Sequence, residues 1–252
     1  MAGRWSWLAL GAGAYLAFTL AAFPASTAYE WFAPPEMTLT GVQGTLWSGG
    51  AANGAVAGLP VQDIRWRVRP WMLLLGRVAA SVESRFADGF VNTNIAVSPG
   101  SVRFTDLRGG TSLPALANVL PVRGMRGQAS LALSMLEIDG GWPSRVIGEL
   151  RLAGLEVAPF IPNGKQQLLA LGDYTVTFME APERELLASF VDNGGPLEVS
   201  GTLGVDAARA YTLDAWIKPR PGAPEQLVEG LKIMTAEPDA EGRRRLTLTG
   251  SL

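Results

Sequence analysis

Two hydrophobic patterns divide the chain. Residues 5–23 form one uncharged run, bounded by Arg4 and Glu30. From Leu39 onward, apolar residues mostly alternate with polar ones. Because a helix rises about 1.5 Å per residue, the first run can span the ~30 Å hydrocarbon core of a bilayer. Alternation with a period of two is typical of strands that bury one face. The pattern therefore predicts one N-terminal transmembrane helix followed by a mainly β body.

The uncharged run has two interpretations. As a membrane anchor, it would begin at Trp5, end at Phe23 and keep the positive charge of Arg4 in the cytoplasm. As a signal peptide, it would be removed after the small residues that end at Ala28. The run is longer than the about 7–15 apolar residues usual in a signal peptide. We therefore expect an anchor, with cleavage as the alternative.

This interpretation orders the chain into four parts. Residues 1–4 would be cytoplasmic, residues 5–23 the anchor, residues 24–38 a juxtamembrane linker and residues 39–252 a periplasmic β-rich domain. Pro34 and Pro35 restrict φ and favour an extended chain, which predicts a stiff linker. Within the β-rich domain we expect no single domain boundary, and the softest places for one are residues 109–110 and 182–185.

The alternation recurs in about a dozen short segments that are joined by turns and rarely by helices. This arrangement predicts a curved antiparallel sheet with an apolar inner face, rather than βαβ units. Two short helices are expected. One would begin after Ser112 as its N-cap, and the other covers residues 224–234, where Leu227, Leu231 and Met234 share one face.

Composition removes several functional classes. The chain has no Cys and no His, which excludes disulfides, cysteine metal sites and Ser-His-Asp or Cys-His catalysis. A net charge of −2 provides no broad basic field for nucleic acid. Carboxylates remain, and Glu180, Glu183 and Glu185 could serve a hydrolase. A solvated hairpin tip around Pro182 is the simpler interpretation, so we expect no enzyme activity and no cofactor.

One strand carries a row of positive charge. Its apolar positions are separated by Arg65, Arg67 and Arg69. This row could contact anionic lipid headgroups or the carboxylates of a partner protein. The simpler interpretation is the solvated face of an amphipathic strand.

Several motifs are spread over nearly the whole chain. Through them the chain resembles the family of type II secretion system protein N. The more specific motifs are Gly44-Thr45-Leu46-Trp47-Ser48-Gly49, Ile64-Arg65-Trp66 and Pro70-x-x-Leu73-Leu74-x-Gly76. The weaker motifs are Leu171-Gly172-x-Tyr174, Gly194-Gly195-Pro196-Leu197-x-Val199-x-Gly201 and Pro219-Arg220.

The resemblance implies a bitopic protein of the bacterial inner membrane, with a short cytoplasmic start and a periplasmic body. Such a protein would assist the export of folded proteins across the outer membrane by docking to other secretion components, without catalytic residues. We name Trp47, Arg65, Arg67 and Arg69 as candidate partner contacts. A more distant resemblance to the curved-sheet proteins of envelope lipid transport leaves an alternative, a periplasmic lipid-handling protein with an apolar groove.

Overall fold

The computed structural model describes residues 11–15, 18–33, 37–56, 59–86, 88–117, 124–158, 168–182 and 185–251. The chain forms two compact units, Met1–Ala87 and Asp88–Leu252. Within the described residues there are fourteen strands and only short helices, and the strand pairs of each unit are antiparallel. The predicted mainly β fold with short helices is therefore confirmed.

The first unit is built around a small sheet with the strand order β1-β3-β4-β5, and β2 pairs with β3. Four short helical segments belong to the described part of this unit: residues 11–15, residues 18–21, one α-helix and one 3-10 helix. The named elements are α2 (Ala25–Phe32), β1 (Met37–Thr40), β2 (Gln43–Gly44), β3 (Ser48–Val56), β4 (Leu59–Val68), η1 (Pro70–Leu75) and β5 (Val78–Phe86).

Strand β4 has the two faces that its sequence predicts. Ile64 is buried, whereas Arg65 and Arg67 are exposed. A bulge precedes this segment, because Asp63 has a φ of +47° and the register with β5 shifts between Gln62 and Arg65. Bulges bend and twist a strand locally. The alternation thus begins anew after the bulge and places Arg65 and Arg67 on the exposed face of β4, with Arg69 just beyond the strand.

The N-terminal region differs in part from the predicted linker. Residues 25–32 form helix α2 rather than an extended chain, and Ala25 and Ala28 are buried. The two prolines lie beyond this helix, so they limit its length without preventing it. Trp5 lies outside the described residues, and Phe23 is half-buried. Among the described residues, no helix is both long and apolar enough to cross a membrane.

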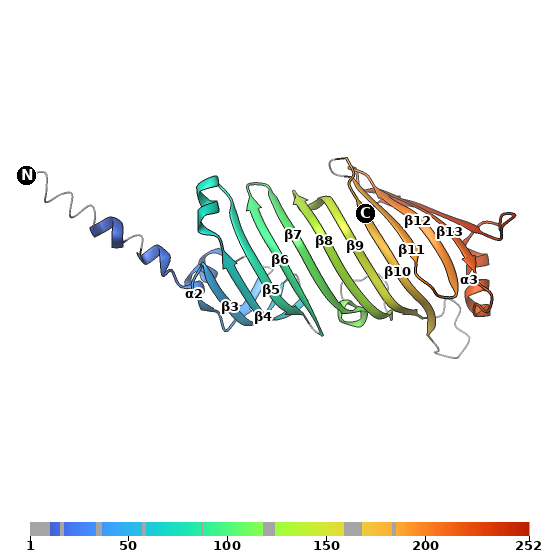
Figure 1. The fold of residues 1–252 in the computed structure, drawn as a ribbon, viewed down its shortest axis with the longest axis horizontal. Helices are drawn as coiled ribbons and strands as arrows, with labels where there is room; N and C mark the ends of the chain where they lie inside the picture. The colour runs from blue at the N-terminus through green and yellow to red at the C-terminus, as the bar shows by residue number, and fades with distance from the viewer. Residues whose placement is uncertain are drawn as a thin grey trace, which may run out of the picture. The chain divides into compact units, whose positions relative to one another are not determined.

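In the second unit, each strand pairs with the next strand along the chain, and β6–β13 lie side by side (Figure 1). Short turns suit such a meander because antiparallel neighbours need no crossover helix. The elements are β6 (Gly89–Ser98), β7 (Ser101–Ser112), η2 (Leu113–Leu116), β8 (Arg126–Asp139), β9 (Trp142–Val157), β10 (Leu169–Met179), β11 (Leu186–Asp192), β12 (Leu197–Val205), β13 (Ala210–Pro219), α3 (Glu225–Met234) and β14 (Arg244–Ser251).

The hydrophobic core of the second unit lies where α3 covers its sheet. Leu227 of α3 is only 1% exposed and packs with Ala215 and Ile217 of β13. The predicted helix is therefore confirmed, and Leu231 also packs against this core. Met234 is 52% exposed, so the last turn of the helix leaves the buried face.

The other predicted helix forms only as the 3-10 element η2. Ser112 precedes it but its side chain makes no capping hydrogen bond. The backbone N–H of Ser112 instead donates to the carboxylate of Asp88 at 3.2 Å. Residues 109–110 lie inside strand β7 rather than at a boundary between units.

Candidate functional site

The Thr45–Ser48 turn, which we define as residues 45–48, connects β2 to β3. The N–H of Thr45 donates to the Ser48 carbonyl at 2.9 Å, and the N–H of Ser48 donates to the Thr45 hydroxyl at 3.1 Å. Two outward-facing carbonyls are also satisfied. Leu46 accepts from the Trp66 indole at 3.2 Å, and Trp47 accepts from the N–H of Val68 at 2.7 Å. The turn is therefore fixed both internally and against β4.

The same turn holds the end of the N-terminal apolar run. The Trp47 indole N–H donates to the Leu20 carbonyl at 2.7 Å, and the Leu46 N–H donates to the Phe23 carbonyl at 2.9 Å. Pro24 forms an isolated antiparallel bridge with Thr45. These contacts join the chain on either side of Pro24 to the first sheet. The Thr45–Ser48 turn is thus the attachment site of the N-terminal segment.

Helix α2 strengthens this attachment through Tyr29. Its hydroxyl donates to the Met37 carbonyl at 3.2 Å and accepts from the Leu39 N–H at 2.9 Å, both on β1. Phe23 and Trp31 form a tilted ring pair with centroids 5.7 Å apart. Aromatic pairs in such a geometry stabilise by about 0.5–1.5 kcal/mol beyond their burial. The helix is therefore held at both of its ends.

Glycine is required at one position beside the turn. A Cβ atom on Gly49 would lie 2.6 Å from the Gln43 carbonyl oxygen and 2.6 Å from the Trp66 ring. Only a residue without a side chain permits this approach. This explains why Gly49 and Trp66, which belong to two separate motifs, occur together.

The structure separates the four predicted partner contacts. Trp47 is half-buried, and its indole N–H is used within the chain. Arg65, Arg67 and Arg69 are exposed, and Arg65 lies opposite Glu83 of β5. The arginine row therefore lies on an exposed surface, whereas Trp47 belongs to the attachment site of the N-terminal segment. Their contact with a partner stays a prediction.

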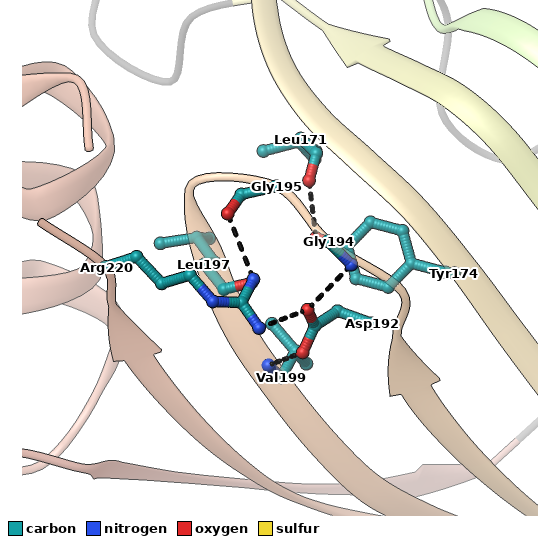
Figure 2. A network of polar contacts seen from close by, with 8 residues as sticks. All are labelled: Leu171, Tyr174, Asp192, Gly194, Gly195, Leu197, Val199 and Arg220. Atoms are coloured by element: carbon teal, nitrogen blue, oxygen red, sulfur yellow. Dashed lines mark hydrogen bonds and ion pairs between the residues drawn. The ribbon is translucent and has the colours of Figure 1, made fainter. Parts of the chain in front are cut away.

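A second polar site lies in the other unit, where three weaker sequence motifs meet (Figure 2). Its centre is Asp192, whose side chain is 5% exposed and lies 2.7 Å from the Arg220 guanidinium. The Asp192 carboxylate also accepts from the N–H groups of Val199 at 2.7 Å and Gly194 at 3.2 Å. Arg220 in turn donates to the carbonyls of Gly195 at 3.0 Å and Leu197 at 2.9 Å. Every one of these contacts fixes the β11–β12 turn.

The same turn approaches β10 closely. A Cβ atom on Gly172, which has a φ of +91°, would lie 2.2 Å from the Gly194 carbonyl oxygen. A Cβ atom on Gly195 would lie 2.4 Å from the Leu171 carbonyl oxygen. Tyr174 closes the site by donating its hydroxyl proton to Leu171 at 3.2 Å. The three motifs are therefore parts of one closely packed polar site.

The pKa values of Asp192 and Tyr174 follow from the contacts of this polar site. Burial acts to raise the pKa of Asp192, but hydrogen bonds from Val199, Arg220 and Gly194 outweigh it and hold the pKa below the ordinary value. Burial raises the pKa of Tyr174, and the charge of Asp192 adds to this effect. The lowered pKa keeps the Asp192 carboxylate charged beside Arg220.

A third site is an exposed aromatic surface at the end of the second sheet. Trp216 on β13 is 38% exposed, and the guanidinium groups of Arg243 and Arg245 lie 5.2 Å and 5.8 Å from its ring centroid. Arg245 also pairs with Asp214, and this hydrogen bond lowers the pKa of the carboxyl. Trp and Arg are the residue types most enriched in the energetic centres of protein interfaces.

The acidic residues considered for catalysis do not form a described site. Glu183 lies outside the described residues, and Glu180 is a surface group 3.9 Å from Arg145. Within the part of the chain that the structure describes, no three His, Cys, Asp or Glu side chains are placed to hold a metal ion.

Comparison with known proteins assigns these features to a family. The model of type II secretion system protein N matches residues 35–247. The chain belongs to this family. The match contains the Thr45–Ser48 turn, the Asp192–Arg220 pair and the Trp216 surface. It also makes the chain a component of the type II secretion system, which is a protein-transport apparatus.

Curated relatives agree with the family match. The type II secretion system protein N of Aeromonas hydrophila is 29% identical over 248 residues, which cover 95% of each chain. The protein of the same name from Vibrio cholerae serotype O1 is 28% identical over 233 residues, covering 87% of this chain and 86% of the relative. No solved structure shows a significant match.

The sequence alone did not reveal two central residues of these sites. Tyr29 and Asp192 lie outside all of the motifs given above. A usable signal for Asp192 is its place directly before Asn193-Gly194-Gly195, since Asp side chains often accept hydrogen bonds from the next turn. Its partner Arg220 comes from another strand end, which no local pattern predicts.

Proposed function

We propose that this chain is a non-enzymatic component of the type II secretion system that is anchored in the inner membrane and acts by protein docking. Residues 5–23 form the anchor, residues 1–4 stay in the cytoplasm, and the β-rich body lies in the periplasm. Other components of the inner-membrane platform and the periplasm are its partners. The observation that carries the docking role is the edge of β14 that no described strand pairs with, beside the Trp216 surface.

The attachment of the N-terminal segment supports a retained anchor. Cleavage after Ala28 would remove the Leu20 and Phe23 carbonyls that accept from the Thr45–Ser48 turn. It would also remove Ala25 and Ala28, which are 3% and 7% exposed in α2. A segment that is integrated in the sheet to this extent is a structural part of the body rather than a disposable leader.

The free strand edge supports docking by β-augmentation. Among the described residues, β14 pairs with β13 alone, and six consecutive residues, 245–250, include only one that is half-buried, Leu246. An unpaired strand offers a row of N–H and C=O groups to a partner strand. Next to it, Trp216 with Arg243 and Arg245 supplies a place for side-chain recognition. Main-chain pairing would give affinity, and this surface would give specificity.

Proline substitutions in β14 test the docking role. Successive residues of a strand direct their backbone groups to opposite edges, so one of Thr247 and Leu248 points its N–H away from β13. Thr247→Pro and Leu248→Pro are therefore matched variants: one removes a bond to β13, and the other blocks only the free edge. Each is expressed in a strain that lacks the chain, and secretion of folded substrates is measured.

The expected result is that both variants fail to restore secretion, although circular dichroism shows that one of them keeps the wild-type thermal unfolding. Thr249→Ser is the control and should restore secretion. Full secretion from the stable proline variant contradicts docking at this edge.

A second candidate function is lipid handling, and the apolar face of β8–β10 favours it. Leu131, Leu150 and Val176 lie side by side in register on this face, and each is only half-buried. Helix α3 covers the core farther along the sheet. Mass spectrometry of the purified full chain would detect a bound acyl lipid at a fixed ratio. Its absence after gentle extraction counts against this function.

A further inference from the structure

A cluster of exposed apolar side chains lies at the β4–β5 connection. Trp71 and Leu73 of η1 are 62% and 44% exposed, and Val78 at the start of β5 is 44% exposed. We call these three residues the η1 patch. Exposed Arg69 precedes it and exposed Arg77 lies within it. Grouped apolar side chains on a surface, rimmed by charged ones, mark an interaction site.

The local backbone fixes the position of this patch. Arg69 donates its N–H to the Ala79 carbonyl at 2.7 Å, which closes the base of the connection. Gly76 ends η1 in the left-handed conformation, with a φ of 68°, and donates to the Leu73 carbonyl at 3.0 Å. The patch is therefore an ordered projection, in which apolar side chains remain exposed despite a defined backbone.

Two hydrogen bonds of Trp47 link the N-terminal apolar segment to the end of β4, which leads into the patch. Trp47 donates to the Leu20 carbonyl at 2.7 Å and accepts from the Val68 N–H at 2.7 Å. Trp71 follows Val68 by three residues, which span at most about 11 Å of extended chain. The patch thus lies close to the point where the apolar segment joins the body. Phe18 and Leu20 of that segment are themselves 78% and 58% exposed.

We propose that the η1 patch inserts into the headgroup region of the membrane, as a second contact that fixes the orientation of the body on the bilayer. The inference rests on the proposed anchor. Trp is the side chain that best suits the membrane interface, and apolar faces of interfacial helices enter it by about 5–10 Å. Arg69 and Arg77 complement anionic headgroups.

Fluorescent labelling of the full chain tests this proposal directly. Because the chain has no Cys, one introduced thiol gives one label. Leu73→Cys reports on the patch, and Ala14→Cys reports on the anchor. Gln62→Cys, on exposed β4 surface, is the control. Each protein is reconstituted in vesicles of phosphatidylethanolamine and phosphatidylglycerol, with and without a nitroxide-labelled lipid.

The proposal predicts that the nitroxide lipid quenches the label at residue 73 strongly, because that label lies in the headgroup region, and quenches the label at residue 62 little. Quenching at residue 14 with none at residue 73 overturns the patch and leaves the anchor standing. Absence of quenching at residues 14 and 73 overturns both the anchor and the membrane contact of the η1 patch. Trp71→Cys provides a second reporter if Leu73→Cys misfolds, and the same outcomes apply.

Charge reversal separates a membrane contact from a protein contact. Arg77→Glu should reduce quenching of the residue 73 label in vesicles that contain phosphatidylglycerol, but not in pure phosphatidylcholine vesicles. Arg126→Glu on β8 is the matched control and should change neither. If the residue 73 label is shielded only when other secretion proteins are present, the patch contacts protein and the membrane proposal is wrong.

Discussion

Asp192 and Trp47 show how a single side chain can stabilise the unit to which it belongs. Asp192 accepts three hydrogen bonds in a nearly buried position, and Trp47 spends its one N–H on the Leu20 carbonyl. A buried polar group that loses its partner costs more than the bond itself contributes. At both positions, a substitution can therefore remove one polar interaction while the side chain keeps nearly the same shape.

Trp47→Phe keeps an aromatic ring and removes the donor to Leu20. We expect it to lower the free energy of unfolding by about 0.5–1.5 kcal/mol and to speed hydrogen exchange at the Leu46 amide. Denaturant titration and exchange measured by mass spectrometry check both effects. Trp71→Phe is the control, since its ring is 62% exposed, and it should change neither quantity. Unchanged exchange in Trp47→Phe contradicts the attachment site.

Asp192→Asn removes the charge of the pair with little change in shape. Because the carboxylate is 5% exposed and Arg220 is left without its counter-ion, we expect a loss of roughly 1.5–3 kcal/mol in unfolding free energy. Glu149→Gln breaks the exposed pair with Arg151 and should cost less than about 1 kcal/mol. If Asp192→Asn and Glu149→Gln lower the unfolding free energy equally in chemical denaturation, the burial of Asp192 adds nothing to the stabilisation by its ion pair.

Acidification tests the same carboxylate. The pKa of Asp192 is lower in the folded chain than its ordinary value of 3.8, and the pKa of Asp88 is lowered to about 2 by hydrogen bonds from Ser112 and Thr111. As the pH falls, the Asp192 and Asp88 carboxyl groups therefore bind protons at a higher pH in the unfolded chain than in the folded chain. Their stabilisation is present above about pH 4 and is lost as the pH falls toward 2. Wild type should unfold more readily across this range, and Asp192→Asn should show a shallower dependence.

At the scale of elements, the alternation of apolar residues predicted the strands well. β4 buries Ile64 and exposes Arg65 as expected, and α3 forms where Leu227 and Leu231 share a face. Helix α2 was missed because its stability comes from contacts of Ala25 and Tyr29 with distant parts of the chain. Local propensity cannot predict such contacts. The Asp192 site was missed for the same reason.

The approach of β10 to the β11–β12 turn depends on glycine. Gly172→Ala would bring a Cβ atom to 2.2 Å from a backbone oxygen in a left-handed conformation. We expect a loss of more than about 3 kcal/mol, seen as reduced thermal stability or failure to fold. Gly204→Ala, with no atom within 4 Å of its Cβ position, should be neutral or stabilising by up to about 1 kcal/mol. A well-folded, fully stable Gly172→Ala variant would contradict this close approach of β10 to the β11–β12 turn.

At the scale of the whole molecule, a meander sheet leaves edges that a closed barrel would not. In the described part of the second unit, β14 is such an edge, and the Trp216 surface adjoins it. The first unit carries the attachment of the N-terminal segment and the η1 patch. The division of labour that we propose follows from these placements: one unit meets the membrane, and the other meets protein partners.

Photo-crosslinking in intact cells tests the docking claim most directly. A photoreactive amino acid at Thr249, exposed on β14, should capture another type II secretion component. The same group at Ser130, exposed on β8 where the strand is paired on both sides, should not capture it. A protein adduct specific to Thr249 is the predicted result. Adducts with lipid alone, or the same adducts from both positions, would contradict docking through β14.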